Sequence, residues 1–225
     1  MKHRSDPVPS AAFAARSGRL ATWLLVLLWL GSWSPAALAG GQQYEPLARS
    51  VRSVLASSVN SGAGPEPVFA SEQEKAEWLE QMAARLPSRW KPTRLERIEF
   101  LKAVRYEAQR AGLDPHLVLG LIQVESNFRR YAVSSVGARG YMQVMPFWTD
   151  LIGAGDVSSL FQMRTNLRYG CTILRHYIDR EKGDLFRALG RYNGSLGKAK
   201  YPNKILKAWR RWQFRPSTGP LQASR

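Results

Sequence analysis

Residues 113–126 read LDPHLVLGLIQVES, and this stretch decides the fold of the chain. Asp114 is a good helix N-cap and Pro115 suits the first helical position, so we expect a helix that begins here and ends near Ser126. Apolar side chains recur along this helix at the three-and-four spacing of a buried face. They are Val118, Leu121 and Ile122.

Glu125 occupies the next position of this apolar series. A carboxyl group at the end of an apolar stripe is poorly solvated, and desolvation raises its pKa because it disfavours the charged form. A general acid that works near neutral pH needs such a pKa. The alternative is that Glu125 sits at the helix terminus and points into water. The helix alone does not decide between these two interpretations.

A loop follows the helix. Its second part, residues 137–148, reads GARGYMQVMPFW, and Gly137 and Gly140 allow the backbone to turn tightly or to approach a ligand closely. The stretch between Ser126 and Thr149 contains no acidic residue. A partner acid for Glu125 is therefore absent from this loop.

Helical signals continue on both sides of this region, and no alternating run predicts a strand. Capping boxes at Ser71 and Thr93 precede apolar periodic stretches, and Asp184 is a further candidate cap. We therefore predict a mainly α fold with a single domain over residues 71–215. The further helices are expected over residues 71–87, 93–112, 163–182, 184–191 and 201–214.

The first 39 residues resemble a secretory signal peptide. Basic residues precede an apolar run over residues 20–30, and Ala37-Leu38-Ala39 offers small residues for cleavage. The leading segment is long, so an uncleaved membrane anchor is the alternative, although the apolar run is short for a membrane span. Either interpretation predicts export from the cytoplasm.

Two further segments are expected to lie outside the domain. Residues 40–70 are rich in Ser, Gly and Pro and show weak periodicity, which predicts a flexible linker with a short helix around residues 47–55. Residues 216–225 are expected to form a disordered tail. Cys171 is the only cysteine, so an intramolecular disulfide is impossible, and we expect a buried apolar filler there rather than a nucleophile.

The formal net charge is +16 at neutral pH. Residues 1–39 carry four basic residues and one acidic residue, so their removal leaves +13. Such a surface attracts polyanions. Nucleic acid is one candidate, but the basic residues are scattered rather than grouped in a recognition helix. An acidic polymer of the cell envelope, or the anionic membrane surface, fits both the charge and the predicted export.

An ordered set of motifs resembles a known family. The motifs are Glu125-Ser126, Ser134, the run from Gly137 to Pro146, Asn166-Leu167 with Gly170, and Tyr192-Asn193. This set resembles that of the soluble lytic transglycosylases over roughly residues 98–195, which implies a mainly α, lysozyme-like (goose-type) catalytic domain with a substrate groove.

This resemblance implies cleavage of the bond between N-acetylmuramic acid and N-acetylglucosamine in peptidoglycan, which leaves a 1,6-anhydro end. Ordinary glycosidases use two carboxylates. Here Glu125 would act first as acid and then as base, while the substrate supplies the nucleophile. The next acids, Asp150 and Asp156, are better explained by helix capping. Alternatives are a hydrolysing muramidase, a non-catalytic peptidoglycan-binding adaptor and a nucleic-acid binder.

By the same resemblance, Ser134 would hydrogen-bond the N-acetyl group and Tyr192 would orient Glu125 or the sugar. Each residue also has a structural explanation as a turn residue, core filler or helix end. The run that ends at Tyr201 lacks the acidic residue expected from larger relatives. The full set of substrate contacts implied by the resemblance is Ser134, Met142, Gln143, Met145, Tyr192 and Asn193.

We expect no cofactor and no metal, because no metal-ligand cluster or nucleotide loop is visible. The expected partner is the peptidoglycan glycan strand, with peripheral membrane or envelope-complex association as an addition. Nucleic acid is not expected as a partner. The chain is expected to be a monomer in the periplasm or cell envelope of a Gram-negative bacterium.

Overall fold

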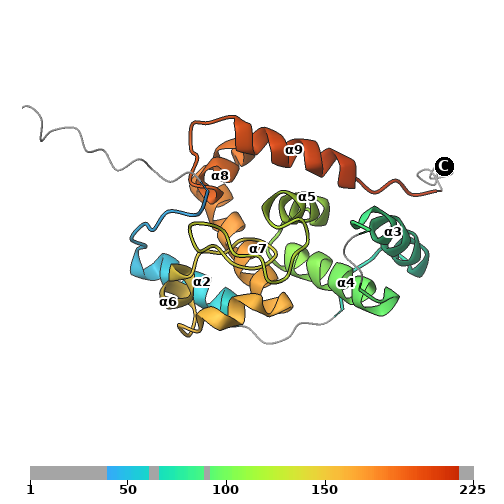
Figure 1. Ribbon diagram of the computed structural model, residues 1–225, viewed down its shortest axis with the longest axis horizontal. Coiled ribbons are helices and arrows are strands. Elements are labelled where there is room, and N and C mark those ends of the chain that lie inside the picture. Colours follow the sequence, from blue (N-terminus) through green and yellow to red (C-terminus); the bar gives the residue numbers. More distant parts are fainter. Residues whose placement is uncertain (1–39, 61–65, 89–91, 218–225) are drawn as a thin grey trace, which may run out of the picture. The chain divides into compact units, whose positions relative to one another are not determined.

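The computed structural model describes residues 40–60, 66–88 and 92–217. The predicted signal peptide and most of the predicted tail lie outside these residues. The described chain is helical apart from isolated bridges that join Val133 to Arg139 and Arg139 to Val144, which confirms the mainly α prediction. The elements are α2 (Arg49–Asn60), α3 (Glu72–Arg85), α4 (Arg94–Arg110), α5 (Pro115–Glu125), α6 (Phe147–Ile152), η1 (Val157–Phe161), α7 (Met163–Arg180), α8 (Leu185–Tyr192) and α9 (Lys200–Trp212) (Figure 1).

Several of these helices begin at the residues that the sequence predicts as N-caps. Thr93 and Glu96 form a complete capping box at α4, with both reciprocal hydrogen bonds present. At α3, Ser71 accepts from the backbone N–H of Glu74, but the Glu74 carboxylate accepts from Ala70 rather than from Ser71. These local hydrogen bonds explain why the helix starts can be read from the sequence.

The helix α5 is buried, and α9 lies along it (Figure 1). A Cβ atom at Gly120 would lie 2.8 Å from the backbone nitrogen of Trp209, so glycine permits the close approach of the two helices. The predicted apolar stripe is fully buried, which fixes the rotation of α5 about its axis. Its members are Val118, Leu121 and Ile122.

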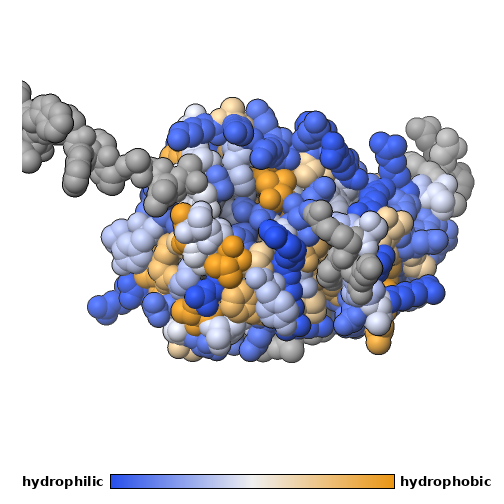
Figure 2. Space-filling view, viewed as in Figure 1, coloured by the Kyte–Doolittle hydropathy of each residue, from blue (hydrophilic) through white to orange (hydrophobic). Residues whose placement is uncertain are grey.

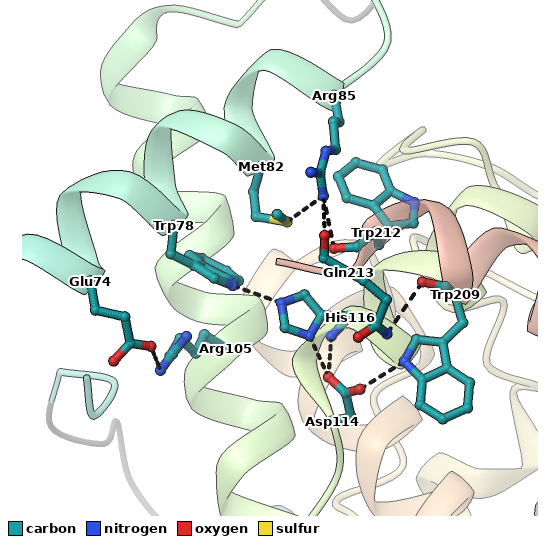
Figure 3. A network of polar contacts seen from close by, with 10 residues as sticks. All are labelled: Glu74, Trp78, Met82, Arg85, Arg105, Asp114, His116, Trp209, Trp212 and Gln213. Atoms are coloured by element: carbon teal, nitrogen blue, oxygen red, sulfur yellow. Dashed lines mark hydrogen bonds and ion pairs between the residues drawn. The ribbon is translucent and has the colours of Figure 1, made fainter. Parts of the chain in front are cut away.

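A polar network fixes the beginning of α5 between α3 and α9 (Figure 3). The Asp114 carboxylate caps the helix at His116 N (2.8 Å) and accepts from Trp209 Nε1 (2.7 Å). The indole of Trp78 donates to His116 Nε2 at 2.9 Å. Because an indole N–H can only donate, Nε2 is the acceptor and the imidazole proton lies on Nδ1, 2.7 Å from Asp114.

The structure differs from the predicted linker at residues 40–60. Residues 40–48 lie against the helical domain, and α2 packs against α6 and α7. Leu55 and Val59, one helical turn apart, are buried in the core. The linker prediction is wrong for this part because two apolar residues at helical spacing anchor α2, although its overall periodicity is weak. The short predicted helix exists, with different bounds.

The face drawn in Figure 2 is dominated by hydrophilic side chains, with apolar ones in small separate patches. Within residues 40–60, 66–88 and 92–217, no helix is both long and apolar enough to span a membrane.

Cys171 is buried and unpaired, as predicted, and burial raises the pKa of its thiol, which disfavours a reactive thiolate.

Candidate functional site

Glu125 is the last residue of α5 and opens onto a pocket of about 310 Å³. Among the described residues that line this pocket, Glu125 is the acidic one, and three lysines face the same space. The side chain of Glu125 is partly buried. The other residues that line the pocket are Gly40, Val124, Asn193, Ser195, Lys198, Lys200, Tyr201 and Lys204.

Tyr201, at the beginning of α9, donates its hydroxyl hydrogen bond to Glu125 Oε1. Burial raises the pKa of Glu125 to about 7, and the hydrogen bond from Tyr201 acts in the opposite direction. Burial also raises the pKa of Tyr201 well above its ordinary value, so the phenol keeps the proton that it donates. These directions agree with the predicted desolvation of Glu125 and disagree with an acid that points into water.

Asn166 holds the loop that follows α5. Its Oδ1 accepts from Met142 N at 2.8 Å, and its Nδ2 donates to the carbonyls of Arg139 (2.9 Å) and Leu160 (2.8 Å). Gly140 has φ +77°, and a Cβ atom there would lie 2.3 Å from Asn166 Nδ2. This glycine is therefore required both for its backbone conformation and for the space that the amide occupies.

Gln143 and Ser134 hold the same loop through local bonds. The Gln143 amide donates to the carbonyls of Ala132 (3.2 Å) and Gly140 (2.9 Å), and its side chain is buried. The Ser134 hydroxyl accepts from Ala138 N at 3.1 Å. In this conformation neither side chain lines the Glu125 pocket. The contacts of Gln143 and Ser134 are those of residues that stabilise a loop and a turn.

The side chains of Met142, in the loop, and Tyr192, at the end of α8, are fully buried. Met142 packs onto Gly170, where a Cβ atom would lie 2.4 Å from its sulfur. The Tyr192 hydroxyl donates to the Met142 carbonyl at 2.8 Å. The Tyr192 hydroxyl was predicted to orient Glu125 or the sugar; in this structure it donates to Met142, and Tyr201 makes the contact with Glu125.

Asn193 lines the pocket, whereas Met145 does not, and the segment before α2 makes hydrogen bonds to both residues. The Asn193 carbonyl accepts from Gly40 N at 3.2 Å. The Gln42 side chain accepts from Met145 N (2.8 Å) and donates to the Gln143 carbonyl (3.1 Å). The segment before α2 thus joins the loop to the end of α8, and its Gly40 lines the Glu125 pocket.

The family model of the transglycosylase SLT domain matches residues 102–214. The chain belongs to this family. The match extends from α4 to the residues after α9 and includes Glu125 and Tyr201. It confirms the resemblance on which the lysozyme-like fold class was predicted.

Curated relatives carry related names. The chain is similar to a transglycosylase of Enterobacteria phage PRD1, at 32% identity over 49% of this chain and 43% of the relative. It is also similar to membrane-bound lytic murein transglycosylase C of Haemophilus influenzae (strain PittEE), at 48% identity over 21% of this chain and 13% of the relative. The chain spans less than half the length of these relatives.

One solved structure shows a partial likeness. It is the lytic transglycosylase Slt from Pseudomonas aeruginosa, determined as an inactive mutant. The TM-score is 0.39 at 22% sequence identity, over 48% of this chain and 20% of that chain.

The sequence did not single out Tyr201 as a partner of Glu125. The two residues are 76 positions apart, and the run that ends at Tyr201 contains no acid that would mark it as part of the site. The available signal was a tyrosine on the buried face of an amphipathic helix, next to Lys198 and Lys200. Gln42 was missed because it lay in a predicted linker.

In the described part of the SLT domain, no group of His, Cys, Asp or Glu side chains could hold a metal ion.

Proposed function

We propose that this protein is a peptidoglycan lytic transglycosylase that cleaves the bond between N-acetylmuramic acid and N-acetylglucosamine and leaves 1,6-anhydro ends. One observation carries the proposal. Glu125 is the acidic residue of a pocket on an SLT domain, and burial raises its pKa to about 7. Such a carboxyl can hold a proton near neutral pH and release it during the reaction.

In the first step, protonated Glu125 donates its proton to the glycosidic oxygen, and the bond between that oxygen and the anomeric carbon breaks. The N-acetyl carbonyl oxygen of the substrate shares an electron pair with the anomeric carbon and replaces the second carboxylate of ordinary glycosidases. Tyr201 donates to Glu125 Oε1 and so stabilises the carboxylate that forms.

In the second step, the Glu125 carboxylate removes the proton from the primary hydroxyl of the same sugar. The hydroxyl oxygen bonds to the anomeric carbon, and the electron pair shared by the N-acetyl oxygen returns to it. The product carries an anhydro ring, and Glu125 is again protonated. One residue therefore acts as acid and then as base, and no water is consumed.

The lysines of the pocket fit an anionic glycan. Lys198, Lys200 and Lys204 line the same pocket as Glu125. Their ammonium groups would attract the carboxylates that muramic acid and its peptide stem carry. The net charge of +16 favours the same kind of partner.

A hydrolysing muramidase is the second candidate. It would require a second carboxylate or a positioned water on the far side of the sugar. Asp156 is instead the N-cap of η1, where Oδ1 accepts from Ser158 N at 2.8 Å. Asp150 is exposed in the first turn of α6. A non-catalytic peptidoglycan adaptor would use the pocket without turnover.

The proposed setting is the periplasm or cell envelope of a Gram-negative bacterium, reached through the signal peptide predicted in residues 1–39. The name of the Haemophilus influenzae relative, a membrane-bound murein enzyme, supports this setting. We propose a monomer that acts on glycan strands in wall turnover or remodelling. Peripheral association with the membrane or an envelope complex is compatible with the basic surface.

Mass spectrometry of the products from purified peptidoglycan tests the activity. The wild type should release anhydro-ended fragments, and Glu125→Gln should lose about 10³-fold in rate because it has no proton to donate. Glu80→Gln is the matched control, since Glu80 is exposed on α3. Reducing ends in place of anhydro ends would identify a muramidase, and binding without products would identify an adaptor.

A further inference from the structure

Residues 40–43, termed the strap, belong to no helix or strand, and the first of them, Gly40, lines the Glu125 pocket. The side chain of Gln42 is 4% exposed, although Gln42 lies just after residues 1–39, the predicted signal peptide. Its carboxamide bridges two backbone groups of the loop, the carbonyl of Gln143 and the N–H of Met145. These loop groups are therefore satisfied by a side chain from a segment about 100 residues away along the chain.

The group that Gln42 presents has the chemistry of an N-acetyl substituent. Both are amides, with a C=O that accepts and an N–H that donates. The C=O and N–H of a trans acetamido group point in opposite directions, so a sugar would engage either Met145 N–H or the Gln143 carbonyl. Gln42 blocks both groups in this conformation.

The strap also narrows the space next to Glu125. Gly40 lines the Glu125 pocket and bonds to the Asn193 carbonyl. The pocket holds about 310 Å³. Ligand sites usually span about 300 to 1,000 Å³, and a glycan must extend on both sides of the bond that is cleaved. The pocket is therefore small for a polysaccharide as long as the strap is seated.

We propose that the strap is autoinhibitory: it occupies a position for a 2-acetamido sugar next to Glu125 and must leave before a glycan strand binds. This inference rests on the proposed function. It adds that the SLT domain is closed by its own N-terminal segment and is opened by whatever displaces that segment.

The contacts of the strap suit reversible seating. Gly41 fits closely, since a Cβ atom there would lie 2.8 Å from Met145 Sδ. Just beyond the strap, Glu45 forms ion pairs with Arg180 and Arg191, which are carried by α7 and α8. Partly exposed ion pairs contribute little to stability, so release of this anchor costs little free energy. The segment then continues into α2, which stays held by its buried residues.

Binding of the N-acetylglucosamine trimer tests the proposal by titration calorimetry, in the otherwise intact chain carrying Glu125→Gln to prevent turnover. Gln42→Ala should bind the trimer about tenfold more tightly, because less of the protein is in the closed state. Glu45→Gln should change affinity in the same direction. Gln43→Ala is the matched control, since it removes the neighbouring glutamine, which is exposed, and it should bind like the parent.

Three outcomes would overturn the proposal. If Gln42→Ala bound the trimer no more tightly than the parent does, the strap would not be inhibitory. If Gln42→Ala increased the affinity for the de-N-acetylated trimer by the same factor, the acetamido assignment would be refuted. Lack of binding by every variant would also contradict it. Failure of the proposed function is distinguishable, because the wild type and the single variant Gln42→Ala would then both give no anhydro products, whatever trimer affinities are measured.

Discussion

Tyr201 and Glu125 form a hydrogen-bonded pair between the first turn of α9 and the last residue of α5. The antiparallel packing of these helices creates the pair. At the other end of the same contact, the Asp114 carboxylate accepts from Trp209 (Figure 3). The position of the acid thus depends on two polar contacts along one helix pair.

Tyr201→Phe removes a hydrogen bond that lowers the pKa of Glu125. We expect the pKa to rise above about 7, so the acid keeps its proton to higher pH. The alkaline limb of the kcat profile should therefore move to higher pH, while kcat at the optimum falls about tenfold because the carboxylate loses its donor.

The pH profile of kcat on purified peptidoglycan checks this expectation. Tyr131→Phe is the matched control, because Tyr131 is 70% exposed and the same hydroxyl is removed there. A limb that stays in place, or that moves to lower pH, would contradict the assigned role of Tyr201.

Glu125 should also make stability depend on pH. Its pKa rises from 4.5 to about 7 on folding, so the native state binds more protons than the unfolded state between these values. The free energy of unfolding should fall as pH increases through this window. At pH 8, Glu125→Gln should be more stable than the wild type by about 2 kcal/mol, with a smaller difference at pH 5.

Urea unfolding at the two pH values measures this difference. Glu80→Gln provides the comparison at an exposed position of α3. A stability gain for Glu125→Gln that is equal at both pH values would show that the charge of Glu125 is not responsible.

Asn166→Ala should loosen the loop beside the pocket. The change leaves the Met142 N–H and the carbonyls of Arg139 and Leu160 without their partner. Unpaired buried polar groups are costly, and we expect a loss of about 3 kcal/mol in the free energy of unfolding. Asn203→Ala, at an exposed position of α9, should be nearly neutral. Denaturant unfolding of both variants provides the comparison, and equal losses would refute the anchoring role.

Gly120→Ala should separate α5 from α9. The added Cβ would lie 2.8 Å from Trp209 N, a backbone atom that cannot move without its helix. We expect a loss of about 2 kcal/mol in stability, and a larger fall in kcat than in substrate binding because Tyr201 is displaced from Glu125. Thermal unfolding and steady-state kinetics test this, and an unchanged melting temperature would rule out the tight contact.

Much of the fold could be predicted because its signals are local. The capping box of Thr93 and Glu96 acts within one helical turn, and so does the Asp114 cap. The apolar stripe offered the desolvation of Glu125 as one of two interpretations, and the buried carboxyl in the structure favours it. The linker prediction failed because the buried contacts of α2 depend on helices far along the chain.

The sequence by itself determined α3, α4, α5, α7, α8 and α9, the mainly α class and the acid at the end of α5, since hydrogen bonds and periodicity over a few residues specify them. Only the tertiary structure decided that Tyr201 donates to Glu125 while Tyr192 donates to Met142, and that Gln42 bonds to the backbone of the loop. The physical reason is long-range packing. Which side chains meet across two helices depends on how closely and in which direction the helices approach, and no local pattern encodes that geometry.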